Sequence, residues 1–218
     1  MTAAEIIAIL WAWTPFLAVG FVWNILISFA AMAIGTPVGL LLAEARLSPR
    51  APVRRIGNFL TAAARAFPTF VLIFYLAYVL PTEFAVGPVT VSLPAWLKAS
   101  LALSVAVAGF VSDNGLSAIQ HWRRGERHEA LLFLPAWSMY FLIIFMASST
   151  ASVIGVPEIV QRANTVIAAV GSSDIMLWVY LYAMAWFFVV SWPVAQAVAL
   201  VRRRLVAEAR ADEPSAAV

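Results

Sequence analysis

Long apolar stretches separated by clusters of arginine constrain this chain more than any other feature of its sequence. Five stretches are long enough to cross the hydrocarbon core of a membrane, which takes about 20 apolar residues in a helix. Eleven of the 14 basic residues fall into three clusters between or after these stretches. By the positive-inside rule the side that the clusters share is the cytoplasm. The clusters are Arg46, Arg50, Arg54 and Arg55, then Arg123, Arg124 and Arg127, then Arg202, Arg203, Arg204 and Arg210.

The composition excludes several classes of protein. A pI of about 9.7 would suggest a nucleic-acid partner for a soluble chain, but basic residues that flank apolar spans need no polyanion to explain them. The sequence contains no cysteine, which excludes disulfides and thiolate metal sites. His121 and His128 lack a carboxylate arrangement typical of a metal site, and the spans contain no evident pair of nucleophile and base. We therefore expect no metal, cofactor or catalytic site in this chain.

The order of apolar and polar segments predicts an all-α integral membrane protein in three parts. Residues 1–18 should form an interfacial helix, because the apolar piece before Pro15 is too short to span. Residues 19–204 should form a five-span domain, and residues 205–218 a cytoplasmic tail. An odd number of spans places the N-terminus outside and the C-terminus inside. The expected spans are Val19–Leu42, Ile56–Leu80, Ala95–Val111, Ala130–Ile154 and Ile175–Val201.

Arg65 lies inside the second expected span. At nine residues from the start of that span it is about 13 Å deep, near the middle of the bilayer, where an arginine costs about 2.5–3.5 kcal/mol. We expect it to be buried and to face protein, water or an anion. The alternative is that Arg65 snorkels to the inner surface, but Ala66–Leu80 alone is short for a crossing. A buried Arg65 would bind a substrate carboxylate or pair with an acid of another subunit.

Two patterns of small residues have two interpretations each. Ser148, Ser149, Thr150 and Ser152 form a polar run in the fourth span, which either lines a passage for a polar solute or packs against neighbouring helices. Gly35 and Gly39 form a GxxxG spacing in the first span. This spacing allows close approach of another helix, and packing within the chain is its simplest use.

Four segments, in the right order, resemble the permease subunits of bacterial ABC importers for polar amino acids. GTPVGLLLAEARLS, from Gly35 to Ser48, is similar to the first span and its exit, and Arg65 and Pro68 match the first and last residues of an Arg-Gly-Thr-Pro motif. ASVIGVPEI, from Ala151 to Ile159, resembles a Ser-Val-Ile-Gly-Val stretch with its acidic residue. Tyr180 to Leu205 resembles the last span and its basic exit.

The resemblance implies a type I importer permease fold in a bacterial inner membrane. It also implies several partners: a second permease subunit, related but different, two cytosolic ATPases that hold ATP and magnesium, and an external solute-binding protein. The path for the solute, a polar amino acid or a similar small molecule, would lie between the two permeases. Arg65, Pro68 and the hydroxyl groups of Ser148, Ser149, Thr150 and Ser152 are the candidate pathway residues.

The cytoplasmic loop between the third and fourth spans departs from the family pattern. Relatives carry a Glu-Ala-Ala stretch, a glycine and a Leu-Pro there, which dock a short helix into the ATPase. Counts from the two ends of the motif disagree by nine residues here, which predicts a truncated loop with a shortened helix from Gln120 to Glu129. A non-transporting membrane scaffold derived from such a permease is the alternative, and a membrane enzyme is a distant third. The candidate coupling residues are Gln120, His121, Trp122, Arg123, Arg124, Gly125, Glu126, Arg127 and Glu129.

Overall fold

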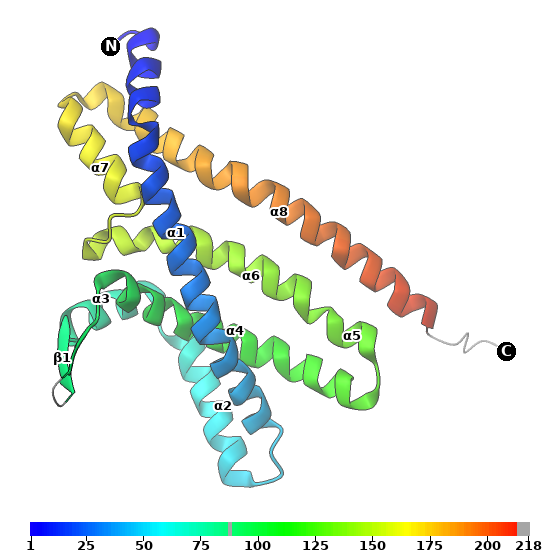
Figure 1. Ribbon diagram of the computed structural model, residues 1–218. Helices are drawn as coiled ribbons and strands as arrows, with labels where there is room; N and C mark the ends of the chain where they lie inside the picture. The colour runs from blue at the N-terminus through cyan, green and yellow to red at the C-terminus, as the bar shows by residue number, and fades with distance from the viewer. Residues whose placement is uncertain (87–88, 213–218) are drawn as a thin grey trace.

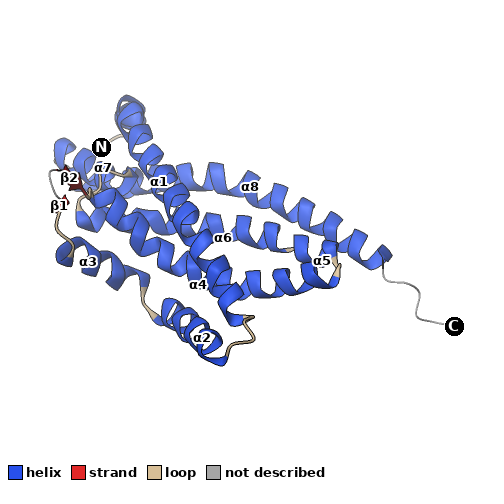
Figure 2. Ribbon diagram, turned by 60° about the horizontal axis from the view of Figure 1, so that its bottom comes forward, coloured by secondary structure: helices blue, strands red, loops and turns tan. Residues whose placement is uncertain are grey.

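A computed structural model describes residues 1–86 and 89–212, and nearly all of them are helical (Figure 1). The three longest helices are α1 (Ala3–Arg46), α4 (Ala95–Arg124) and α8 (Met176–Asp212). The shorter helices are α2 (Ala51–Ala66), α3 (Thr69–Val79), α5 (Arg127–Leu131), α6 (Phe133–Ala147) and α7 (Ile159–Val170), with 3₁₀ segments η1 (Ser148–Ile154) and η2 (Ser173–Ile175). The small hairpin of β1 (Glu83–Val86) and β2 (Val89–Ser92) is the exception to the expected all-α fold (Figure 2).

The expected spans correspond to helices of suitable length and composition. Four helical segments are long and apolar enough to cross a membrane, and α2 with α3 would make a fifth as a bent pair. α1 contains 44 residues and is about 66 Å long, more than twice the thickness of a hydrocarbon core of about 30 Å. Parts of α1 must therefore lie beyond the apolar layer. The expected interfacial helix of residues 1–18 is continuous with the first span, because Pro15 lies inside α1 without ending it.

Gly35 and Gly39 allow α1 to pack directly on α4. A Cβ atom at Gly35 would lie 2.5 Å from the Ser104 carbonyl oxygen and 2.5 Å from the Val107 Cβ. At Gly39 it would lie 2.6 Å from the Val111 Cβ. These separations are shorter than van der Waals contact, so only glycine permits this approach of the two backbones. The GxxxG spacing therefore serves packing within the chain.

Buried side chains form two clusters along α1. Leu17 and Phe21 belong to the first, with side chains of α6, α7 and the start of α8. Ile27 and Met32 belong to the second, with side chains of α4, α6 and η1. In α8 no residue between positions 184 and 208 is buried, and Figure 1 shows this helix diverging from α1 toward its C-terminal end.

The second expected span is bent, so the prediction of one continuous helix over Ile56–Leu80 is wrong. α2 and α3 meet at an angle of 95°. Pro68 lacks an N–H group and holds the preceding residue, Phe67, in an extended conformation with φ −72° and ψ 124°. Each half is too short to cross the hydrocarbon core by itself.

Lys98 on α4 fixes the far end of α3. Its Nζ donates hydrogen bonds to the carbonyl oxygens of Ala77, at 3.1 Å, and Leu80, at 2.6 Å. Lys98 is only 3% exposed. Its charge meets the negative end of the α3 dipole, so the α3 terminus supplies the partners that a buried ammonium requires.

The third helix extends further than expected. α4 continues past Val111 through the polar segment to Arg124, where Gly125 ends it in the left-handed conformation with φ 84°. The two connections expected outside also have defined structure. Residues 81–94 contain the hairpin, whose positions 87 and 88 lie outside the described residues, and residues 155–174 contain α7 and η2.

α7 packs against the N-terminal part of α1. A Cβ at Gly20 would lie 2.9 Å from the Ile159 backbone. Arg162 donates from Nη1 to the Phe16 carbonyl oxygen at 3.1 Å, and its guanidinium lies 4.4 Å from the centre of the Phe16 ring. At the other end of the chain, the expected tail continues as helix to Asp212, and residues 213–218 lie outside the described residues.

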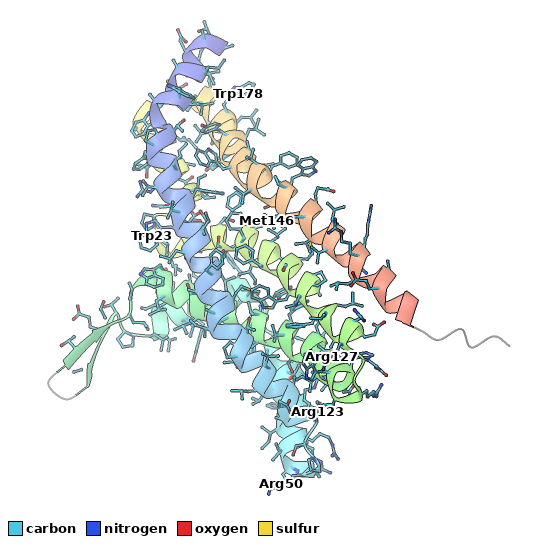
Figure 3. The ribbon with its side chains drawn as sticks, turned by 45° about the vertical axis from the view of Figure 1, so that its right-hand side comes forward. Trp23, Arg50, Arg123, Arg127, Met146 and Trp178 are labelled. Atoms are coloured by element: carbon cyan, nitrogen blue, oxygen red, sulfur yellow. The ribbon has the colours of Figure 1, made fainter. Side chains whose placement is uncertain are left out.

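The first two basic clusters gather at one end of the molecule. Figure 3 shows Arg50, Arg123 and Arg127 at the end opposite to Trp178 and the N-terminus. The basic segment of α8 approaches the same end, because α8 contacts α5.

Substitution of Gly39 by valine should destabilise the helix pair α1–α4. The added side chain meets Val111 and forces the helices apart, which costs about 1–3 kcal/mol. The midpoint of thermal unfolding of the purified protein measures this loss. Ala33→Val is the matched control, because Ala33 is exposed on the same helix. Equal stability of the two variants would show that the close approach is not required.

Candidate functional site

Asp113 on α4 lies between two arginines. Its Oδ1 accepts a hydrogen bond from Arg46 Nη1 at 2.7 Å, and its Oδ2 accepts one from Arg65 Nη1 at 2.6 Å. Arg46 stands at the end of α1 and Arg65 in the last turn of α2. Two guanidinium groups thus share one carboxylate, and the cluster carries net positive charge.

The two arginines differ in how firmly the fold holds them. Arg46 also donates to the Ser112 carbonyl oxygen and hydroxyl, both at 3.1 Å, and to Asn58 Oδ1 at 3.1 Å. Its side chain is 17% exposed, whereas 64% of the Arg65 side chain is exposed. Arg65 makes a single ion pair and leaves most of its five N–H donors available. Arg46 therefore links α1 to α2 and α4, whereas most donors of Arg65 are available to a ligand.

A pocket of about 340 Å³ opens beside Arg65 and Asp113. Its volume lies at the lower end of the range typical of small-molecule sites, about 300–1,000 Å³. One wall is aromatic, because Phe110 and Tyr140 stack with ring centres 3.9 Å apart. The lining residues are Ala64, Arg65, Phe67, Thr69, Ala106, Phe110, Asp113, Asn114 and Tyr140.

Within this chain, most of the Arg65 side chain is exposed, whereas the sequence predicts a buried arginine. Its acidic partner in the same chain is Asp113. Pro68 contributes the break between α2 and α3 and does not line the pocket.

The hydroxyl run lies in a different place from Arg65. Ser148, Ser149, Thr150 and Ser152 occupy η1, and each hydroxyl donates to the carbonyl oxygen three residues earlier. Only Ser148 is fully buried, and the other three are half-buried. None of the four lines the pocket at Arg65. The structure thus does not join the two groups of candidate pathway residues into one site.

A buried polar group links η1 to α1 and α7. The Asn24 side chain donates to Ser148 Oγ and to Glu158 Oε2, each at 3.0 Å. The Glu158 carboxylate caps α7 by accepting from the backbone N–H groups of Val160 and Gln161. Burial raises the pKa of Glu158 above its ordinary value, and these hydrogen bonds offset only part of that rise. The acidic residue of the ASVIGVPEI segment therefore begins a helix and closes a packed junction.

The candidate coupling residues surround a tight turn. Gln120 to Arg124 are the last residues of α4, and Glu129 belongs to α5, so the expected single short helix from Gln120 to Glu129 is wrong. The left-handed Gly125 makes a reversal there instead.

Local contacts hold this turn. His121 Nδ1 lies 2.6 Å from Glu126 Oε2, and Arg123 Nη2 donates to Glu44 Oε2 on α1 at 2.6 Å. The Arg127 guanidinium lies 5.9 Å from the centre of the Trp122 ring. Trp122 is 59% exposed. The Arg124 guanidinium makes no hydrogen bond or ion pair with any residue whose side chain the structure describes. The turn presents an aromatic and basic surface.

The sequence reasoning missed Asp113, Asn24 and Lys98. The expected third span ends at Val111, which leaves Asp113 in the following loop, although a lone acid at the end of an apolar run is the natural partner for an arginine in the neighbouring span. Asn24 is a single polar residue in an apolar stretch, which is a signal of an internal hydrogen bond.

No family model matches this chain, whereas curated proteins and a solved structure do. The chain is 26% identical over 172 residues to the probable amino-acid ABC transporter permease protein YckA of Bacillus subtilis. The matched region covers 70% of this chain and 74% of YckA. The chain is 23% identical over 211 residues to the L-cystine transport system permease protein TcyB of the same organism, covering 88% and 87%. Its fold matches a crystal structure of an amino acid ABC transporter with histidines, with a TM-score of 0.74 and 20% identity over 88% of this chain and 95% of the other.

Replacement of the two arginines should affect stability unequally. Arg46→Gln removes several hydrogen bonds from a mostly buried side chain and should cost about 1.5–3 kcal/mol. Arg65→Gln removes one exposed ion pair and should cost about 0–1 kcal/mol. Thermal unfolding in the same detergent compares them. A loss for Arg65→Gln as large as for Arg46→Gln would mean that Arg65 has a structural role after all.

Proposed function

We propose that this chain, a membrane-spanning permease subunit of an ABC importer, forms half of the translocation path for a polar amino acid. The observation that carries this proposal is the exposed Arg65 beside Asp113 in a pocket. The names of the sequence relatives and the fold of the solved transporter support it.

The charges of the pocket suit the backbone groups that all amino acids share. An α-carboxylate can take the free N–H donors of Arg65, whose planar fork matches a carboxylate in two parallel hydrogen bonds. An α-ammonium can take Asp113, whose carboxylate already accepts from two cations. The excess of positive charge favours the carboxylate as the first group to bind. In this scheme Arg65 releases Asp113 and binds the substrate carboxylate, and Asp113 binds the substrate ammonium. No charge is therefore left unpaired.

We further propose the assembly and orientation of the subunit. A second, related permease would face this one across the path, an external protein would deliver the solute, and two cytosolic ATPases would hold ATP and magnesium. The turn between α4 and α5 would contact an ATPase through Trp122, Arg124 and Arg127. The chain would lie in a bacterial inner membrane with its N-terminus outside and its C-terminus in the cytoplasm, because the basic clusters favour the cytoplasmic side.

A scaffold without transport is the competing function. The observation that favours it is the replacement of a separate coupling helix by a tight turn at Gly125. A scaffold and a transport subunit differ in one outcome. Loss of uptake both on deletion of this chain and on Arg65→Ala, with folding of the variant intact, would rule out the scaffold.

Arg65→Gln should reduce uptake at least tenfold in membrane vesicles that contain the complete importer. The glutamine keeps length and polarity but loses the charge that holds a carboxylate. Uptake of radiolabelled polar L-amino acids, normalised to the amount of folded transporter, measures the effect. Arg55→Gln is the matched control, because Arg55 is exposed on the same helix and lies outside the pocket. Unchanged uptake in Arg65→Gln would remove the site from the path.

Arg124→Glu should weaken retention of the ATPase during purification. The substitution reverses a charge on the exposed turn without breaking a described contact. Co-purified ATPase per chain, quantified by mass spectrometry, should fall several-fold, whereas Arg55→Glu should leave it unchanged. Equal retention in both variants would place the ATPase contact elsewhere.

A further inference from the structure

A groove of about 490 Å³ lies between α6 and the C-terminal part of α8. Met139 of α6 forms one side, and the other side comes from one face of α8. The α8 positions share one helix face, because they fall at i, i+3, i+4, i+7, i+8 and i+11. They are Ala195, Val198, Ala199, Arg202, Arg203 and Val206.

The groove changes character along its length. Ala195, Val198 and Ala199 are small and apolar, so this part of α8 offers a slot without polar groups. One turn later the same face carries Arg202 and Arg203, both exposed. Neither arginine makes a hydrogen bond or ion pair with any residue whose side chain the structure describes.

We propose that this groove binds one anionic phospholipid. An acyl chain would lie along the small apolar residues, and the phosphate would accept hydrogen bonds from Arg202 and Arg203. The arginines stand where the apolar stretch of α8 ends, which is the depth of lipid head groups in a membrane. Guanidinium groups bind phosphate oxygens in a bidentate manner. Two arginines also favour a headgroup with a net negative charge over phosphatidylcholine, whose choline cation offsets the charge of its phosphate.

The arrangement favours a lipid over a protein segment as the occupant. Among the described residues, the lining side chains include no carboxylate, hydroxyl or amide group that a protein partner would need to match, only apolar side chains and two guanidinium groups. The closest described acid along α8 is Glu208, whose carboxylate lies 3.9 Å from His128 of α5. The charge of the arginines thus remains available to a lipid phosphate.

Native mass spectrometry of the purified importer, titrated with phosphatidylglycerol and separately with phosphatidylcholine, tests the site. Each arginine near an anionic lipid surface contributes roughly fivefold in affinity, so Arg202→Gln with Arg203→Gln should weaken phosphatidylglycerol binding about 25-fold. Phosphatidylcholine binding should weaken much less, because its choline cation offsets the charge of its phosphate. The matched control is Arg204→Gln, because Arg204 is exposed on the same helix but does not line the groove. An unchanged affinity in the double variant, or an equal loss in Arg204→Gln, would overturn the proposal.

A second measurement identifies the occupant directly. The chain has no cysteine, so Ala199→Cys places a single photo-reactive maleimide label on this chain, inside the groove. Illumination of the assembled importer in phosphatidylglycerol-containing membranes should attach a phospholipid to this chain, detected as an increase in its mass. Attachment to a second protein subunit instead would show that a subunit covers the groove and would refute the lipid site. This outcome leaves uptake and the role of Arg65 untouched, so the two proposals fail independently.

Discussion

Close contact between the backbones of α1 and α4 organises the rest of this structure. Gly35 and Gly39 remove the side chains that would separate the two helices. Lipid provides no hydrophobic driving force for helices to associate, so close packing and hydrogen bonds between the helices must hold α1 and α4 together. α2 then packs on both helices near Gly57 and Gly109, and its polar residue Thr61 bonds to Ser112 of α4 at 2.7 Å. The arginine and aspartate cluster is located by this three-helix junction.

The spans were predictable because the membrane restricts what a chain can do there. Every backbone N–H and C=O group must be paired internally, so a long apolar run becomes a helix whatever its neighbours are. Interruptions depend on tertiary contacts and were less accessible. Pro68 was visible in the sequence, but the 95° bend also needs Lys98 to hold the end of α3. The hairpin lies between two expected spans, where the sequence predicts only a connection. Its sequence signal is the pair of short segments on both sides of Gly87 and Pro88.

The same reasoning explains where the site prediction succeeded and failed. Arg65 was singled out because an arginine within an apolar run is costly, and it does stand at a pocket. Its partner was missed, because Asp113 was assigned to a loop that began after Val111. α4 continues as helix through this position, where the acid pairs with both Arg46 and Arg65. A pairing between residues 48 positions apart depends on how helices associate, which a single sequence does not display.

Lys98 has a consequence for how the protein enters the membrane. α3 has 11 residues and cannot hold itself across a bilayer, and the carbonyl groups at its end are paired by a lysine that the ribosome delivers only later. Lys98 in turn loses its ligands if α3 is absent. Neither element is therefore stable as a separate insertion intermediate. α3 and α4 must therefore pass from the translocation machinery into lipid together.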